Sequence, residues 1–182
     1  MRRPSKHQYY MNLAREASTR ATCDRAHVGC VLVRFSKRGD SIVATGYNGA
    51  PSGHPHCDEV GHDMENGHCV RAVHAERNAI YQCARIGVSA DGAVAYCTVM
   101  PCVKCTEALH SAGVRLVYFE QLYKSMSDDD VSRIRLYVKA GMDFCYLVDG
   151  EVVDATPRVW ISLNRIRPRT EVEESSLFLL NL

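Results

Sequence analysis

The sequence lacks a long apolar run, a long block of like charge and any low-complexity segment. Of its 182 residues, 46% are hydrophobic and 24% are charged, and the formal net charge is +1. This balance is typical of a globular protein and excludes a fibrous or disordered chain. Because no run of Lys or Arg concentrates positive charge, we expect no polynucleotide partner. The apolar end of the chain is too short to span a bilayer, so we also expect no membrane partner.

An apolar segment is also missing after the basic opening residues 1–4, where a signal peptide would carry one. We therefore expect an intracellular, cytoplasmic protein. The nine cysteines are an odd number, so they cannot all form disulfides within one chain. Without an export signal, metal ligands and small buried hydrophobes are the expected uses of these residues.

The hydrophobic pattern predicts a helix, a hairpin and then alternating helices and strands. The predicted helices span roughly 6–21, with Ser5 as the N-cap, 73–85, 102–112 and 129–140, and the predicted strands span roughly 28–33, 41–47, 93–98, 114–119 and 143–148. This order predicts an α/β fold, a three-layer α/β/α sandwich around a central mixed five-stranded sheet.

The domain organisation follows from the same pattern. We expect residues 1–149 to form one domain and residues 150–182 to form a C-terminal extension. The extension would pack on its own domain or on a neighbouring subunit, with the former favoured. Residues 48–70 are rich in Gly, Pro, His, Asp and Cys and show no apolar period, so they predict a long loop. Long loops within compact domains are usually functional.

Two short motifs, each at the start of a predicted helix, carry most of the chemical information. His74 and Glu76 form H-x-E, and Cys102 and Cys105 follow Pro101 as P-C-x-x-C. Two cysteines three apart at a helix start can direct both sulfurs to one point, and the helix dipole favours the thiolates that zinc requires. His74 as a third ligand would leave one tetrahedral position open for water. We expect zinc to convert this water to hydroxide and Glu76 to act as general acid and base.

Each motif has another interpretation when it stands alone. A C-x-x-C motif also occurs in redox sites and in structural zinc sites, and here Glu76 or another cysteine could close the metal site as a fourth ligand. The two motifs together form the pattern of zinc-dependent nucleobase deaminases. The combination therefore favours an open, catalytic zinc site.

At these motifs the chain resembles the cytidine deaminase-like superfamily, and the surrounding residues resemble its deoxycytidylate deaminases. The resemblance covers roughly residues 5–148 and runs through 22–23, 28–29, 46–53, 56–57, 67–71, 74–80, 91–93, 101–102, 105, 112–114 and 123. The segment Gly46-Tyr47-Asn48-Gly49 separates this branch from tRNA adenosine deaminases and from deaminases of free cytidine.

The resemblance implies hydrolysis of dCMP to dUMP and ammonia, which supplies dUMP for thymidylate synthesis. Zinc-bound hydroxide would attack C4 of cytosine while Glu76 passes protons to N3 and to the departing amine. The backbone N–H of Ala75 would hold O2, Asn48 would contact the sugar and base, and Tyr123 would pack on the ring or sugar. Without the resemblance, Asn48 could be a turn residue and Tyr123 an ordinary half-buried aromatic. Gln121 stands where the family often carries an acidic residue.

The substrate phosphate needs a cation or backbone N–H donors. Arg25 and Arg71 are the candidates because they lie near the segments that form the site. Either could instead be a solvated surface arginine.

A second group of potential metal ligands lies outside the two motifs. Cys23, Cys57, His62 and Cys69 are the expected ligands, with His68 as a substitute. A polar loop this long cannot order itself by burying apolar area, and a structural zinc could supply that energy. Some relatives carry such a second metal, and His62 stands where they often have cysteine. The alternative is a set of free thiols and exposed histidines.

The resemblance also bears on assembly and regulation. Many relatives are hexamers that are activated by dCTP and inhibited by dTTP, through a site formed partly by the loop after Tyr47. We therefore expect a homo-oligomer, with a hexamer favoured, and an Mg²⁺ ion accompanying a dCTP effector. The glycines of residues 48–53 would allow such a site, although a plain turn explains them equally well.

Two other functions remain open at this point. The first is a zinc deaminase that acts on dCTP, on a 5-substituted dCMP or on a base within RNA. The second is a zinc module without catalytic activity that serves as a scaffold for a partner.

Overall fold

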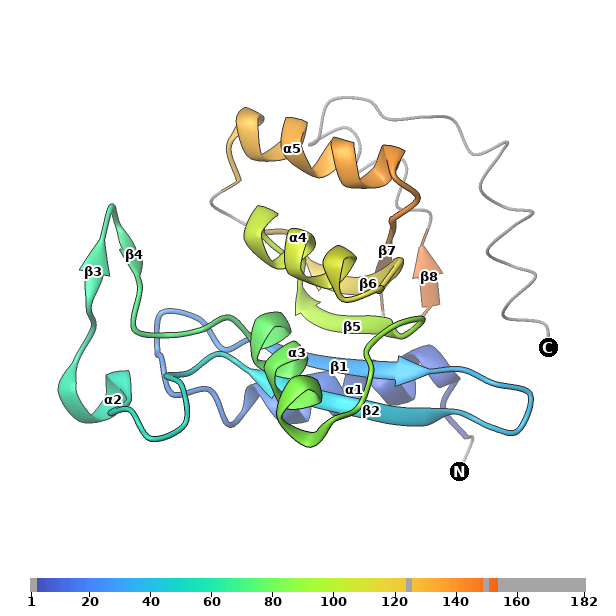
Figure 1. The fold of residues 1–182 in the computed structure, drawn as a ribbon, viewed down its shortest axis with the longest axis horizontal. Coiled ribbons are helices and arrows are strands. Elements are labelled where there is room, and N and C mark those ends of the chain that lie inside the picture. Colours follow the sequence, from blue (N-terminus) through green and yellow to red (C-terminus); the bar gives the residue numbers. More distant parts are fainter. Residues whose placement is uncertain (1–2, 124–125, 149–150, 154–182) are drawn as a thin grey trace.

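The computed structural model describes residues 3–123, 126–148 and 151–153 (Figure 1). Its elements in chain order are α1 (Lys6–Ser18), β1 (Gly29–Arg34), β2 (Ser41–Tyr47), α2 (Cys57–Val60), β3 (Met64–Glu65), β4 (His68–Cys69), α3 (Ala75–Ile86), β5 (Val94–Val99), α4 (Val103–Ser111), β6 (Leu116–Gln121), α5 (Asp128–Lys139), β7 (Asp143–Val148) and β8 (Glu151–Val153). No helix among these residues is long and apolar enough to cross a membrane.

The main sheet has the strand order β2-β1-β5-β6-β7-β8. Strand β1 is antiparallel to β2 and β5, and β5, β6 and β7 are parallel. The predicted mixed five-stranded sheet is therefore confirmed. The short strand β8 extends it, antiparallel to β7, within residues assigned to the C-terminal extension. Residues 154–182 lie outside the described residues, so the packing of the extension stays a prediction.

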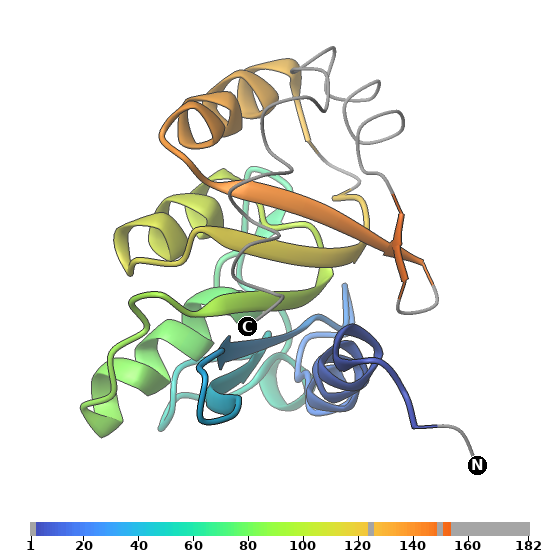
Figure 2. The ribbon, with the colours of Figure 1, turned by 90° about the vertical axis from the view of Figure 1, so that its right-hand side faces the viewer.

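The sheet lies between two helical layers, as the predicted sandwich requires. Helix α1 covers one face, and α3, α4 and α5 cover the other (Figure 2). Successive side chains of β1 point to opposite faces of the sheet. Val31 and Val33 pack in the core beneath α1, whereas Cys30 and Leu32 pack in the core beneath the other helices. A strand covered on both faces is apolar throughout, which explains its continuous hydrophobic sequence.

Helix α1 begins where it was predicted but is shorter. The Ser5 side chain accepts a hydrogen bond from the backbone N–H of Gln8, as an N-cap does. The helix ends at Ser18 and not at residue 21, because the backbone N–H and the hydroxyl of Thr19 both donate to the carbonyl of Glu16. These bonds close the last turn of the helix.

The prediction of a structureless loop over residues 48–70 is wrong in part. The segment contains α2 and a small hairpin of β3 and β4. Asn66 (φ 49°) and Gly67 (φ 79°) form the turn of this hairpin. Asn-Gly is the preferred sequence for such a two-residue turn, because both central residues need positive φ. That local signal was present in the sequence.

Two glycines on neighbouring strands allow helices to approach the sheet from opposite sides. A Cβ atom at Gly29 would lie 1.8 Å from the carbonyl oxygen of Ala14 in α1. A Cβ atom at Gly46 would lie 2.1 Å from the carbonyl oxygen of Ala75 and 2.6 Å from the backbone nitrogen of Ala79, both in α3. The clashing atoms are backbone atoms, so a side chain at either position would displace a helix.

We therefore expect Gly46→Ala to lower the free energy of unfolding by about 3 kcal/mol or more, in the upper range for overpacking. Chemical denaturation followed by circular dichroism measures the change. Ser41→Ala, at an exposed position at the start of the same strand, is the matched control and should change stability by less than about 0.5 kcal/mol. Equal stability of Gly46→Ala and the parent would contradict the close packing of α3 on β2.

Candidate active site

Three of the predicted ligands meet where two helices begin. His74 is the N-cap of α3, and Cys102 is the N-cap of α4, with Cys105 in its first turn. The Nδ1 atom of His74 lies 3.6 Å from the sulfur of Cys102 and 3.5 Å from that of Cys105. The three ligand atoms all lie within 4.8 Å of one another. The spacing predicted from the two motifs is thus realised as one compact group.

The charges of this group suit a divalent cation. A hydrogen bond from the Cys105 thiol lowers the pKa of Cys102 to about 4, whereas this hydrogen bond and burial raise the pKa of Cys105. Hydrogen bonding to Cys102 raises the pKa of His74. Without a cation, the two thiols therefore differ in acidity. A cation at this point would stabilise both sulfurs as thiolates, so the donor set fits zinc.

Glu76 lies beside this group and is almost fully buried, with 3% of its surface exposed. It belongs to the first turn of α3, two residues after His74. Burial raises the pKa of its carboxyl group. Within the described residues its Oε2 atom is buried and has no hydrogen-bond partner. A carboxyl group in this state can exchange protons with a molecule in the adjacent cavity.

A cavity of about 430 Å³ opens at His74, Glu76 and Cys102. This volume is in the usual range for a small-molecule site. Of the predicted substrate contacts, Asn48, Tyr123 and Arg25 line it. Ala75 is not among the lining residues, but it is the first residue of α3, where backbone N–H groups have no acceptor within the helix. The predicted contact of its N–H with the base remains a prediction.

Asn48 is buried, and its side chain holds the segment between α1 and β1. Its amide oxygen accepts from the backbone N–H of Val28 at 2.7 Å. Its amide nitrogen donates to the carbonyl of Ala26 at 2.7 Å and to that of Cys23 at 3.4 Å. Both amide hydrogens are thus used within the protein, and the oxygen keeps one lone pair. Only that lone pair can accept a hydrogen bond from a ligand.

The two candidate phosphate ligands lie in different places. The guanidinium of Arg25 donates to the carbonyl of Gly67 at 2.8 Å and lines the cavity. Arg71 donates to the carbonyl of Gly61 at 3.1 Å and is not among the lining residues. His27 also lines the cavity, although its position in the sequence gave no indication of this. The role of His27 is seen only in the folded structure, where the segment between α1 and β1 forms part of the cavity wall.

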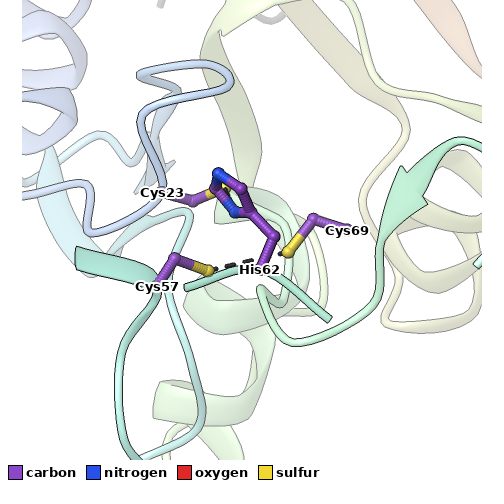
Figure 3. A group of neighbouring side chains, drawn as sticks. All are labelled: Cys23, Cys57, His62 and Cys69. Carbon is purple, nitrogen blue, oxygen red and sulfur yellow. Dashed lines mark hydrogen bonds between the residues drawn. The ribbon is translucent and has the colours of Figure 1, made fainter. Parts of the chain in front are cut away.

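The second predicted group of ligands also comes together (Figure 3). The ligand atoms of Cys23, Cys57, His62 and Cys69 all lie within 4.8 Å of one another. The sulfur of Cys23 lies 3.8 Å from Nδ1 of His62, and the sulfurs of Cys57 and Cys69 are 3.6 Å apart. His68, the substitute ligand, is not in this group and instead lines the cavity.

The cysteines of this second group differ in acidity. Burial, together with hydrogen bonds to neighbouring sulfurs, raises the pKa of Cys57 to about 12. Burial opposes ionisation of Cys69 as well, but hydrogen bonds from the backbone of Ala72 and from His62 lower its pKa to about 6. As in the first group, two neighbouring thiols thus differ in acidity. The Nε2 atom of His62 lies 2.9 Å from a carboxylate oxygen of Asp24, which orients the ring as is usual for a metal-bound histidine.

Comparison with known proteins agrees with this geometry. Residues 4–121 match the family model described as the cytidine and deoxycytidylate deaminase zinc-binding region. The chain is 42% identical over 125 residues to ComE operon protein 2 of Bacillus subtilis. The match covers 69% of this chain and 64% of that protein. It is 35% identical over 131 residues to the deoxycytidylate deaminase of a Mycobacterium phage. This match covers 65% of this chain and 97% of that protein.

A further relative is longer than this chain. Identity to the deoxycytidylate deaminase of Saccharomyces cerevisiae is 35% over 130 residues, and the match spans only 39% of that protein. Among solved structures, the dCMP deaminase of the cyanophage S-TIM5 in complex with dCMP and dUMP matches with a TM-score of 0.64 and 30% identity, over 81% of this chain and 100% of that chain. The family match spans α1 to β6, including His74, Cys102 and Cys105, and the chain therefore belongs to the zinc-binding cytidine and deoxycytidylate deaminases.

Proposed function

We propose that this protein hydrolyses dCMP to dUMP and ammonia and so supplies dUMP for thymidylate synthesis. The observation that carries the proposal is the group of His74, Cys102 and Cys105 beside the buried, unpaired Oε2 of Glu76. The names of the relatives and of the structure with dCMP and dUMP support the choice of substrate. We further propose a homo-oligomer, with a hexamer favoured, in the cytoplasm.

The chain itself supplies the proton transfers and the binding contacts. A zinc ion held by His74, Cys102 and Cys105 would acidify a water molecule and so provide a nucleophile near neutral pH. Glu76 Oε2 would take a proton from the attacking water, deliver one to N3 of cytosine and then protonate the departing amine. Burial raises the pKa of the Glu76 carboxyl group, which makes it a stronger base toward the attacking water.

The remaining contacts orient the nucleotide. The N–H of Ala75, at the positive end of α3, would donate to O2 of the base. The free lone pair of Asn48 would accept from the sugar, and Tyr123 would pack on the ring or sugar, since both residues line the cavity. Arg25 would pair with the 5′-phosphate.

We also propose a structural zinc at Cys23, Cys57, His62 and Cys69. Helix α2 has four residues and the hairpin has two residues in each strand, which is too little to be stable in isolation. A metal bound by residues on both sides of these elements would supply the missing stability.

We also propose that dCTP and dTTP regulate the protein at a site formed partly by the loop after Tyr47. An Mg²⁺ ion would accompany dCTP at this site.

The substitution Glu76→Gln tests the reaction. We expect at least an approximately hundredfold loss of kcat for ammonia release from dCMP, because the amide cannot carry the proton. Zinc content and melting temperature should stay close to those of the parent. Glu107→Gln, at an exposed position on α4, is the control and should keep full activity. A parent protein that released no ammonia from dCMP, or an active Glu76→Gln variant, would overturn the proposed function.

Arg25→Gln tests the phosphate contact. The loss of a charge-assisted hydrogen bond should raise KM for dCMP about tenfold and leave turnover of deoxycytidine, which has no phosphate, nearly unchanged. Steady-state kinetics with both substrates give the comparison. Arg71→Gln is the matched control, because Arg71 lies outside the lining of the cavity. An equal effect of Arg25→Gln on both substrates would argue against a phosphate contact.

Cys57→Ser tests the second metal. We expect the variant to contain one zinc ion fewer per chain by elemental analysis and to melt at a lower temperature than the parent, since the order of the loop depends on the metal. His54→Gln replaces an exposed histidine of the same loop that is outside the ligand group, and it should retain the zinc content of the parent. Unchanged zinc content in Cys57→Ser would exclude this site.

A further inference from the structure

An ion pair that no step of the proposed reaction uses joins α1 to β6. It is formed by Arg15 of α1 and Glu120, the next-to-last residue of β6. The Nε atom of Arg15 donates to one carboxylate oxygen at 2.9 Å, and its Nη2 atom donates to the other. The Nη1 atom donates to Oδ1 of Asn12, on the same helix, at 2.8 Å. Two parallel hydrogen bonds fix the orientation of both groups, so the pair links α1 and β6 in one defined geometry.

Glu120 is the more buried partner of this pair. Its side chain is 13% exposed, whereas that of Arg15 is 45% exposed. An ion pair at an open surface contributes little, but removing one partner of a mostly buried pair leaves a charge without compensation. Glu120 would then regain water by a shift of the end of β6. The position of this end therefore depends on Arg15.

The residues that follow Glu120 form one wall of the catalytic cavity. Gln121, Leu122 and Tyr123 all line it. The carbonyl of Gln121 accepts a hydrogen bond at 2.8 Å from the backbone N–H of Met100, which lines the cavity as well. A shift at Glu120 would therefore be passed to the wall that carries Tyr123, the proposed contact of the ring or sugar.

The segment that follows α1 forms the neighbouring wall. It carries Arg25, the proposed phosphate contact, and it leads into β1. Cys30 of β1 pairs with Cys97 of β5 in the antiparallel sense, so the start of β1 lies beside the end of β5. At that end, Val99 pairs with Gln121 of β6. The ion pair between α1 and β6 thus joins the helix that leads into one wall to the strand that ends in the other.

The groups that would carry out the reaction are on other elements. His74 and Glu76 belong to the start of α3, and Cys102 and Cys105 belong to the start of α4. Both helices lie on the face of the sheet opposite to α1 (Figure 2). Loss of the ion pair should therefore weaken binding of the nucleotide and leave the chemistry at the base nearly unchanged.

We propose that Arg15 is a positioning residue for nucleotide binding. It acts through Glu120 and holds the wall with Tyr123 at a fixed distance from the wall with Arg25. The inference rests on the proposed function, because it takes these two walls as the ones that contact the sugar and the phosphate. Arg15 is not among the described residues that line the cavity, so its effect on the ligand is indirect.

Calorimetric titration of the zinc-loaded, full-length protein with dUMP, together with steady-state kinetics with dCMP, tests this inference. We expect Arg15→Gln to weaken dUMP binding and to raise KM for dCMP about fivefold, the size of one partly lost contact. The value of kcat should stay within about twofold of the parent, as for a loss of uniform binding. Arg20→Gln, at an exposed position just after α1, removes the same charge and should keep the constants of the parent.

Two further variants show whether Arg15 acts through Glu120. Arg15→Lys keeps the charge but donates from a single nitrogen, so its dUMP affinity should lie between those of the parent and Arg15→Gln. Glu120→Gln should reproduce the loss of affinity. The double variant should be little worse than either single variant, because the two residues make one contact.

Three results would overturn the inference. Arg15→Gln could leave both dUMP affinity and KM unchanged, it could lower the melting temperature and kcat without a change in dUMP affinity, or its effect and that of Glu120→Gln could add fully. Should Arg15→Gln fail to fold, as melting curves would show, the affinity of Arg15→Lys decides. A protein that shows the expected dUMP affinities but does not deaminate dCMP would refute the proposed function and leave the role of Arg15 intact, so the two failures are distinguishable.

Discussion

The site depends on the meeting of the N-termini of α3 and α4 near the carboxyl end of β5. The first strand of the parallel part, β5, ends just before Cys102, and α3 reaches the same place through the packing of Ala75 against Gly46. Each helix brings its predicted metal ligands as N-caps or in the first turn, and neither His74 nor Cys102 uses its side chain in a capping hydrogen bond. The positive ends of both helices then act on the same small volume. The low pKa of Cys102, which hydrogen bonds from Cys105 and His74 produce, and the burial of Glu76 both depend on this arrangement.

The second group of cysteines and histidine adjoins the active site, because Cys23 and Cys69 line its cavity. Cys23 begins the segment that Asn48 holds by three hydrogen bonds, and this segment carries Arg25 and His27 into the cavity. Cys69 follows His68 directly, and both line the cavity wall. Atoms that bind a metal at the second group would thereby position the wall that faces the nucleotide. The proposed metal and the proposed nucleotide site would thus be connected through the same backbone.

Much of this organisation can be predicted from the sequence because its signals are local. H-x-E and P-C-x-x-C at helix starts define the meeting of His74, Cys102 and Cys105, and the apolar pattern predicts the sandwich. The Asn66-Gly67 turn was equally local, but the polar composition around it obscured a hairpin of two residues per strand. Other features arise only from contacts distant in sequence, such as the use of both amide hydrogens of Asn48 by the carbonyls of Cys23 and Ala26. Strand β8 has three residues, which are too few to show a hydrophobic pattern. It joins the sheet by pairing with β7.

Gly29 and Gly46, on the two strands of the hairpin, affect how the helical layers are coupled. Gly29 pairs with Tyr47, and Gly46 pairs with Cys30, so the two glycines are on adjacent strands one residue apart in register. Helix α1 touches the backbone of one strand, and α3 touches that of the other, without an intervening side chain. Elsewhere in the sandwich, two layers of interdigitating side chains can absorb small shifts of a helix. At these two glycines, only hydrogen-bonded strand backbone separates α1 from α3, the helix that carries Glu76, so a shift of one helix would be passed to the other through backbone contacts.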